Sequence, residues 1–173
     1  MDTPQSDPIR NRVDESGLIA LDLDQLIPAK TIQSLDLSTF LESGLILREK
    51  PFRSAMAELS AEDWQGKTAA LHCSSEAIIP DWAWMLATSK LTNLGADVHI
   101  GDEKRTRELL LLEAIDSLDL TLYQDGRLVI KGCSTATNGE SLARVIKRLQ
   151  PVAQSIFYGE PCSTVPVYKR PKK

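Results

Sequence analysis

The most constraining feature of the sequence is a regular alternation of short apolar runs and longer amphipathic stretches between residues 67 and 150. Short apolar runs bounded by breakers predict buried strands, and apolar residues at helical spacing predict helices. Strands separated by helices of this length require a mostly parallel sheet with right-handed crossovers. We therefore predict an α/β fold, an open, mostly parallel sheet with helices on both faces. The predicted strands are 67–73, 96–100 and 127–133, and the predicted helices are 81–94, 103–118 and 139–150.

The sequence before residue 67 predicts an N-terminal extension of strand and helix. Residues 18–23 begin as a continuous apolar run and end in alternation, which indicates a strand. Ser34 or Asp36 is a candidate N-cap for a short helix, and apolar residues recur at helical spacing over 52–59. We expect the strand to be covered on at least one face.

The C-terminal segment 159–166 contains two prolines, which exclude a regular helix and predict an extended arm that folds back over the sheet edge. Residues 1–16 are polar and are predicted to be a flexible lead-in. A chain of 173 residues is long enough to bury a core without disulfides or metals. We therefore expect residues 17–173 to form a single α/β domain.

Composition argues against several classes of partner. The net charge is −4 and the pI is near 5.2, whereas nucleic-acid binding is driven by clustered lysine and arginine. No apolar stretch is long enough to cross a bilayer, and the first residues lack the features of a secretory signal. The sequence also lacks the glycine-rich nucleotide-binding patterns and the H-E-x-x-H zinc pattern. We expect a cytoplasmic protein that binds neither nucleic acid nor membranes.

The three cysteines are the strongest functional signal, because each is followed by two hydroxyl residues. Cys73 and Cys133 each close a predicted strand, at the carboxyl edge where parallel sheets bind ligands. If the strand order is 96–100, 67–73, 127–133, these two cysteines lie on neighbouring strands, about 4.8 Å apart. Cys162 lies in the predicted arm, which can bring a third thiol to the same edge. We therefore predict one shared site.

Three thiolates are soft ligands, so such a site favours zinc or an iron–sulfur cluster. His99, near the end of its predicted strand, is the candidate fourth ligand. The neighbouring hydroxyl groups are predicted to contact a bound cofactor. These hydroxyl residues are Ser74, Ser134, Thr135 and Ser163.

Two alternatives stay open. In the first, one cysteine is a nucleophile and the chain is a thiol-dependent enzyme or a sulfur carrier. A cysteine-phosphatase loop is not present, because Ile79 and Gly139 stand where its arginine is required. In the second, the cysteines are buried structural residues of an interaction module. A homodimer is compatible with each of these alternatives.

Several segments resemble an uncharacterised bacterial family, the domain of unknown function with the number 2480. The resemblance covers nearly the whole chain, and all three cysteines match the family's positions. It implies a cytoplasmic setting and an association with iron–sulfur cluster assembly proteins, but it implies no reaction. The segments that carry it are 44–53, 77–83, 131–134, 149–153 and 159–166.

Overall fold

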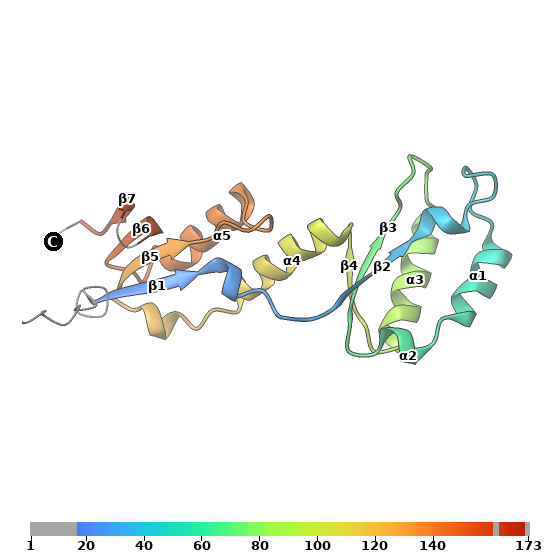
Figure 1. Cartoon of the computed structure of the whole chain (residues 1–173), viewed down its shortest axis with the longest axis horizontal. Helices are drawn as coiled ribbons and strands as arrows, with labels where there is room; N and C mark the ends of the chain where they lie inside the picture. Colours follow the sequence, from blue (N-terminus) through green and yellow to red (C-terminus); the bar gives the residue numbers. More distant parts are fainter. Residues whose placement is uncertain (1–16, 161–162, 172–173) are drawn as a thin grey trace, which may run out of the picture. The chain divides into compact units, whose positions relative to one another are not determined.

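A computed structural model describes residues 17–160 and 163–171 (Figure 1). The predicted lead-in, residues 1–16, lies outside the described residues, as does Cys162. The chain forms two compact units. We call residues 27–113 the inserted unit and residues 1–26 with 114–173 the discontinuous unit. Each unit has its own sheet and is described by itself.

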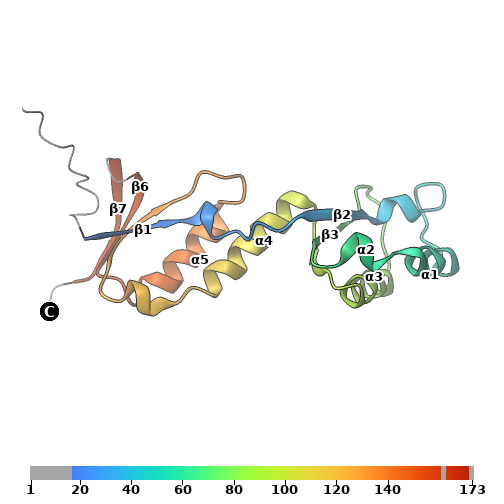
Figure 2. The same cartoon turned by 60° about the horizontal axis from the view of Figure 1, so that its bottom comes forward.

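The inserted unit is built on a three-stranded parallel sheet in the order β2-β3-β4. These strands are Ile32–Asp36, Thr68–His72 and Asp97–Ile100. Two longer helices lie along the same face of this sheet in both views (Figures 1 and 2). They are α1, Glu49–Glu58, and α3, Asp81–Asn93, and a short helix, α2, spans Ala61–Trp64. Helix α4, Glu103–Asp116, begins in this unit.

The core of the inserted unit lies between its helices and its sheet. Alanine side chains face the sheet from α3, and larger residues of α1 and β3 fill the space around them. Phe52 on α1 is 1% exposed and makes edge-to-face contacts with Phe40 and Trp82. The fully buried members include Phe52, Ala69, Leu71, Ala83, Ala87 and Leu91. This packing fixes the carboxyl end of β3, where Cys73 begins a loop.

The discontinuous unit contains a four-stranded sheet in the order β1-β5-β6-β7. The first three strands are parallel, and β7 pairs antiparallel with β6. These strands are Leu18–Asp22, Arg127–Lys131, Ser155–Glu160 and Ser163–Lys169. Helix α5, Gly139–Leu149, starts with an Asn138–Ser141 capping box and buries Val145 and Leu149.

The two units share one plan. In each, three parallel strands follow in sequence order, with a helix between the second and the third: α3 before β4, and α5 before β6. A glycine of positive φ lies at the end of the third strand in each unit: Gly101, at 139°, directly follows β4, and Gly159, at 119°, is the penultimate residue of β6. The penultimate residues of the central strands β3 and β5 are Leu71, which pairs with Ile100, and Ile130, which pairs with Tyr158. Each glycine directly follows this partner on the third strand.

The structure confirms the α/β fold and corrects the strand order. The predicted strand 67–73 is β3, whose neighbours are β2 and β4, and the predicted strand 127–133 is β5, whose neighbours are β1 and β6. The prediction that these two strands are adjacent is therefore wrong. It failed because β2, which the sequence analysis did not identify, takes the place beside β3. Ser34 and Asp36, the candidate N-caps of the short helix expected before Phe40, both belong to this strand.

Asp36 does cap a helical turn, but a short one. Its side chain accepts a hydrogen bond from Ser38 N at the start of the 3₁₀ segment Leu37–Phe40. In the arm predicted at 159–166, the described residues are extended: Gly159 and Glu160 end β6, and residues 163–166 begin β7, while residues 161–162 lie outside the described residues. In the part of the chain that the structure describes, no helix has the length and apolar character needed to span a bilayer.

Candidate functional site

An open groove of about 540 Å³ lies at the carboxyl ends of β3 and β4, within the inserted unit. This is the edge at which parallel sheets bind ligands. The groove combines a thiol, an imidazole, a guanidinium and an apolar wall. Its lining residues are His72, Cys73, Ser74, Trp84, Ile100, Gly101, Asp102 and Arg105.

Cys73 is the first residue after β3 and is half-buried. Its Sγ lies 3.3 Å from Ser75 Oγ, and the thiol donates to the Ser75 carbonyl oxygen at 3.5 Å. The Ser75 hydroxyl also accepts a hydrogen bond from Ala77 N at 3.3 Å. The sulfur is therefore held by its own loop and has a hydroxyl group within reach.

Asp36 fixes this loop from the neighbouring strand. Its Oδ1 accepts hydrogen bonds from Ser74 N at 3.0 Å and from Ser38 N at 2.9 Å, while the hydroxyls of Ser38 and Ser74 lie 2.9 Å apart. Desolvation by burial favours the neutral acid, but the hydrogen bonds from Ser74 and Ser38 outweigh it and hold the pKa of Asp36 well below its usual range. Asp36 is consequently a charged anchor for the residue after Cys73.

The opposite wall of the groove is the turn from β4 into α4. Gly101 N donates to Leu71 O at 2.9 Å, which joins the turn to the end of β3. Asp102 Oδ1 accepts from Arg105 N at 2.8 Å and so caps the first turn of α4. The Arg105 guanidinium pairs with Glu108 at 3.0 Å. At Gly101, a Cβ would lie 2.7 Å from the side chain of Arg105, so the wall needs glycine there.

Only one of the two histidines, His72, lines the groove. The Nε2 of His72 lies 2.7 Å from Ser34 Oγ. His99, the predicted fourth metal ligand, is 7% exposed and is not among the lining residues. Its ring nitrogens lie 3.4 Å from an Asp97 oxygen and 3.7 Å from a Glu113 oxygen.

The equivalent edge of the discontinuous unit carries Cys133, which is exposed. Asp24 Oδ2 accepts from Cys133 N at 3.0 Å and from Ser134 N at 3.2 Å, and Thr137 Oγ1 donates to its Oδ1 at 3.4 Å. The Ser134 hydroxyl is the largest cause that lowers the pKa of Asp24. Desolvation by burial raises this pKa, but the hydrogen bonds from the backbone of Cys133 and Ser134 and from Thr137 lower it further, so the net shift is downward. In both units, then, an aspartate at the end of the first strand or just after it binds the backbone that follows the second strand.

The structure does not bring the predicted cysteine site together through neighbouring strands. Cys73 follows β3 of one sheet and Cys133 follows β5 of the other, while Cys162 lies outside the described residues. Within residues 17–160 and 163–171, no group of three or more histidine, cysteine or acidic side chains is placed to hold a metal ion.

The predicted hydroxyl residues are likewise distributed over both units. Ser74 lines the groove, Ser134 lies beside Asp24, Thr135 is exposed, and Ser163 begins β7 opposite Glu160. Sequence reasoning did not identify Trp84 and Arg105 as groove residues. Both residues lie on helices, and no local sequence pattern marks them as groove residues. The only available signal was that α3 follows β3 and that α4 follows β4.

The fold and the groove define an α/β protein that presents a thiol at the carboxyl edge of a parallel sheet. The chain belongs to the family described as proteins of unknown function, DUF2480, whose family model matches residues 7–170. No curated protein matches the chain, and no solved structure matches it.

Proposed function

We propose that the chain carries out thiol-dependent chemistry on a small molecule in the groove beside Cys73, as a thiol enzyme or as a sulfur carrier. One observation carries this proposal: a half-buried thiol lines an open groove at the ligand-binding edge of a parallel sheet. A volume of about 540 Å³ is typical of a small-molecule pocket.

The neighbours of Cys73 supply what such a reaction needs. The sulfur attacks an electrophilic atom of the bound molecule, and the Ser75 hydroxyl, 3.3 Å away, is within reach to donate to the sulfur while it carries negative charge. Trp84 and Ile100 offer an apolar wall, and Arg105 offers a positive group for a polar end of the substrate. These groups suit a substrate with one apolar and one polar side.

In the sulfur-carrier form of the proposal, the Cys73 thiolate attacks the outer sulfur of a donor persulfide. The new sulfur–sulfur bond forms on Cys73, the donor's sulfur–sulfur bond breaks, and the donor leaves as a thiolate. Cys73 then holds the transferred atom as its own persulfide. No external oxidant or reductant is required, because the sulfane sulfur changes only its carrier.

A metal centre is the competing hypothesis, with zinc or an iron–sulfur cluster as the cofactor. The metal centre requires the thiols that follow β3 and β5 to bind the same metal or cluster. These two strands belong to different sheets. The association with iron–sulfur assembly proteins, a homodimer and a cytoplasmic location remain predictions. The ligands of the metal centre would be Cys73, Cys133, Cys162 and His99.

The decisive experiment compares thiols within one protein. The full chain is purified anaerobically and alkylated with iodoacetamide under native conditions, and the rate at each cysteine is followed by peptide mass spectrometry. We expect Cys73 to react faster than Cys133, although Cys133 is the more exposed of the two. Ser75→Ala should slow Cys73 about fivefold, which corresponds to one ordinary hydrogen bond. The control Thr135→Ala, two residues after Cys133, should leave the Cys73 rate unchanged.

Two other outcomes reject the proposal, and a third one identifies which of its two forms holds. A Cys73 that reacts more slowly than Cys133 and ignores Ser75→Ala is a structural cysteine. Stoichiometric zinc, or iron with acid-labile sulfide, that is lost both in Cys73→Ser and in Cys133→Ser supports the metal centre instead. A mass increase of one sulfur atom on Cys73 after incubation with a persulfide donor identifies the sulfur-carrier form.

A further inference from the structure

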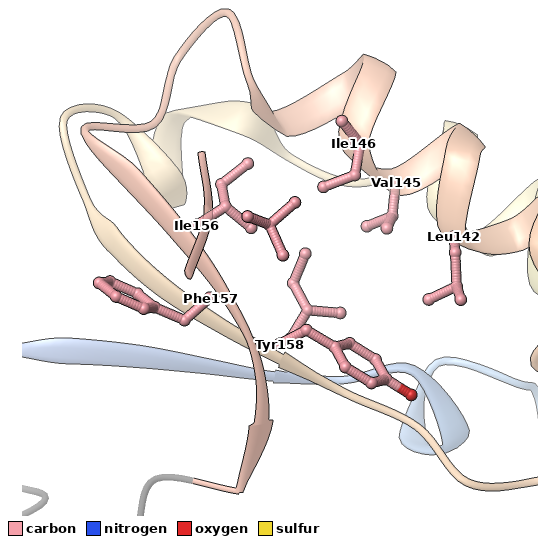
Figure 3. Close-up of a pocket in the computed structure, with 8 residues that line it drawn as sticks. Leu142, Val145, Ile146, Ile156, Phe157 and Tyr158 are labelled. Atoms are coloured by element: carbon pink, nitrogen blue, oxygen red, sulfur yellow. The ribbon is translucent and has the colours of Figure 1, made fainter. Parts of the chain in front are cut away.

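The discontinuous unit contains a second cavity, which has a different chemistry from the groove. It has a volume of about 200 Å³ and lies between α5 and strands β5, β6 and β7 (Figure 3). Leu142, Val145 and Ile146 enter it from the helix, and Ile156 and Tyr158 face them from the sheet, whereas the Phe157 ring points away. Ile130 and Val167 complete the lining.

The lining offers almost nothing to a polar ligand. Apart from Tyr158, every lining side chain is a hydrocarbon. The Tyr158 hydroxyl donates to the carbonyl oxygen of Gly132 at 3.1 Å, so its proton is already used within the protein. A bound water needs two or more polar partners, and cavities that lack them stay dry. The cavity therefore favours an apolar occupant over water.

The cavity is also accessible from outside. Val167 is 50% exposed and Tyr158 is 36% exposed, so two of the lining residues reach the surface. Two other lining residues are closed off from solvent: Val145 on α5 is fully buried, and Ile130 on β5 is 2% exposed. The cavity is therefore open to solvent on the side of Val167 and Tyr158.

We propose that this cavity is a binding site for a small apolar molecule or group, of the size of one aromatic ring or a short alkyl chain. The size follows from the volume, because an engineered cavity of about 150 Å³ with similar lining binds benzene. The site is separate from the thiol groove and does not depend on the chemistry of Cys73.

Benzene is the probe that tests this site. The full chain, with labelled methyl groups, is titrated with benzene and followed by methyl NMR. We expect saturable shifts at Leu142, Val145, Ile146 and Ile156, and none at the core methyls of the inserted unit. Val167→Phe fills the cavity from its exposed wall and should weaken benzene binding at least about tenfold.

The same substitution at an exposed residue away from the cavity is the control. Leu122 is 68% exposed in the same unit and does not line the cavity, so Leu122→Phe should bind benzene like the unmodified chain. If Val167→Phe does not fold, Ile146→Phe fills the cavity from the helix instead. The proposal is overturned if benzene near its solubility limit shifts no lining methyl, or if the filling variant and the control bind benzene equally well.

Discussion

Asp36, the last residue of β2, accepts a hydrogen bond at 3.0 Å from the backbone N–H of Ser74, the residue after Cys73. This bond joins two strands at the point where their ladder ends, since Asp36 is paired with His72 in the register. It also determines the direction in which the chain leaves β3. The shape of the groove around Cys73 therefore depends on a carboxylate from the neighbouring strand.

Replacing this carboxylate should destabilise the protein in a pH-dependent way. Asp36→Asn removes the charge that Ser74 and Ser38 stabilise, and we expect it to lower the free energy of unfolding by about 1 kcal/mol near neutral pH. Because the pKa of Asp36 is lowered in the folded state, its contribution is complete above the unfolded pKa of about 3.9. It is lost as the pH falls from there toward the folded pKa.

Urea unfolding at several pH values measures this difference. All three tryptophans lie between residues 64 and 84, so their fluorescence reports on the inserted unit that contains Asp36. The difference in the free energy of unfolding between the unmodified chain and Asp36→Asn should be constant above about pH 5 and should become smaller at lower pH. A gap that widens on acidification would contradict the assigned role of the carboxylate.

Asp24 should protect the backbone at Cys133 in the same manner. It accepts from Cys133 N at 3.0 Å and from Ser134 N at 3.2 Å, so Asp24→Ala leaves both N–H groups without this acceptor. We expect hydrogen exchange at these two amides to accelerate about tenfold, which corresponds to the loss of one charge-assisted bond. Amide exchange by NMR measures it. The amide of Val129, in the buried middle of β5 of the same unit, should not change; acceleration there as well would indicate general unfolding of this unit.

The core contact of Phe52 should dominate the stability of the inserted unit. Its ring lies 5.5 Å from that of Phe40 and 5.9 Å from that of Trp82, and the residue is 1% exposed. Phe52→Ala should cost about 3–5 kcal/mol, since the cavity it leaves is walled by aromatic rings. Met85→Ala on the exposed side of α3 should change stability by less than about 0.5 kcal/mol. Equal effects of the two substitutions in urea unfolding would refute this view of the core.

Local signals in the sequence predicted most of the helices and strands, because their causes are local. Asp102 caps α4 as expected, and Pro151 follows α5 closely. The strand β2 was missed because Gln33 and Ser34 interrupt its apolar pattern, although Leu35 is buried against the core. Its identity as a strand depends on pairing with β3, which no local pattern reveals.

The cysteine site shows the same limit at longer range. That each of two cysteines follows a strand was predictable, but which strands are neighbours depends on non-local pairing. The chain inserts a complete three-stranded sheet between β1 and β5. Cys73 and Cys133 thus have similar surroundings in sequence but belong to separate sheets. The aspartates that bind the loops beside them, Asp36 and Asp24, were not recognised as loop anchors because their bonds span more than thirty residues.

Gly101 provides the sharpest test of the groove, since its backbone has φ at 139°, a conformation that residues with a Cβ rarely adopt. A methyl group there would also lie 2.7 Å from two side-chain carbons of Arg105. Gly101→Ala should therefore lower the free energy of unfolding by about 1–3 kcal/mol and displace Arg105, which lines the groove.

Gly139→Ala is the matched control, because Gly139 is the first residue of α5 and has open space around it. Alanine at that position should be neutral or slightly stabilising, since it reduces the entropy of the unfolded chain. Thermal unfolding by circular dichroism compares the two variants, and alkylation of Cys73 reports on the groove in each. If Gly101→Ala is as stable as Gly139→Ala and leaves the Cys73 rate unchanged, the β4–α4 turn does not shape the groove as the structure indicates.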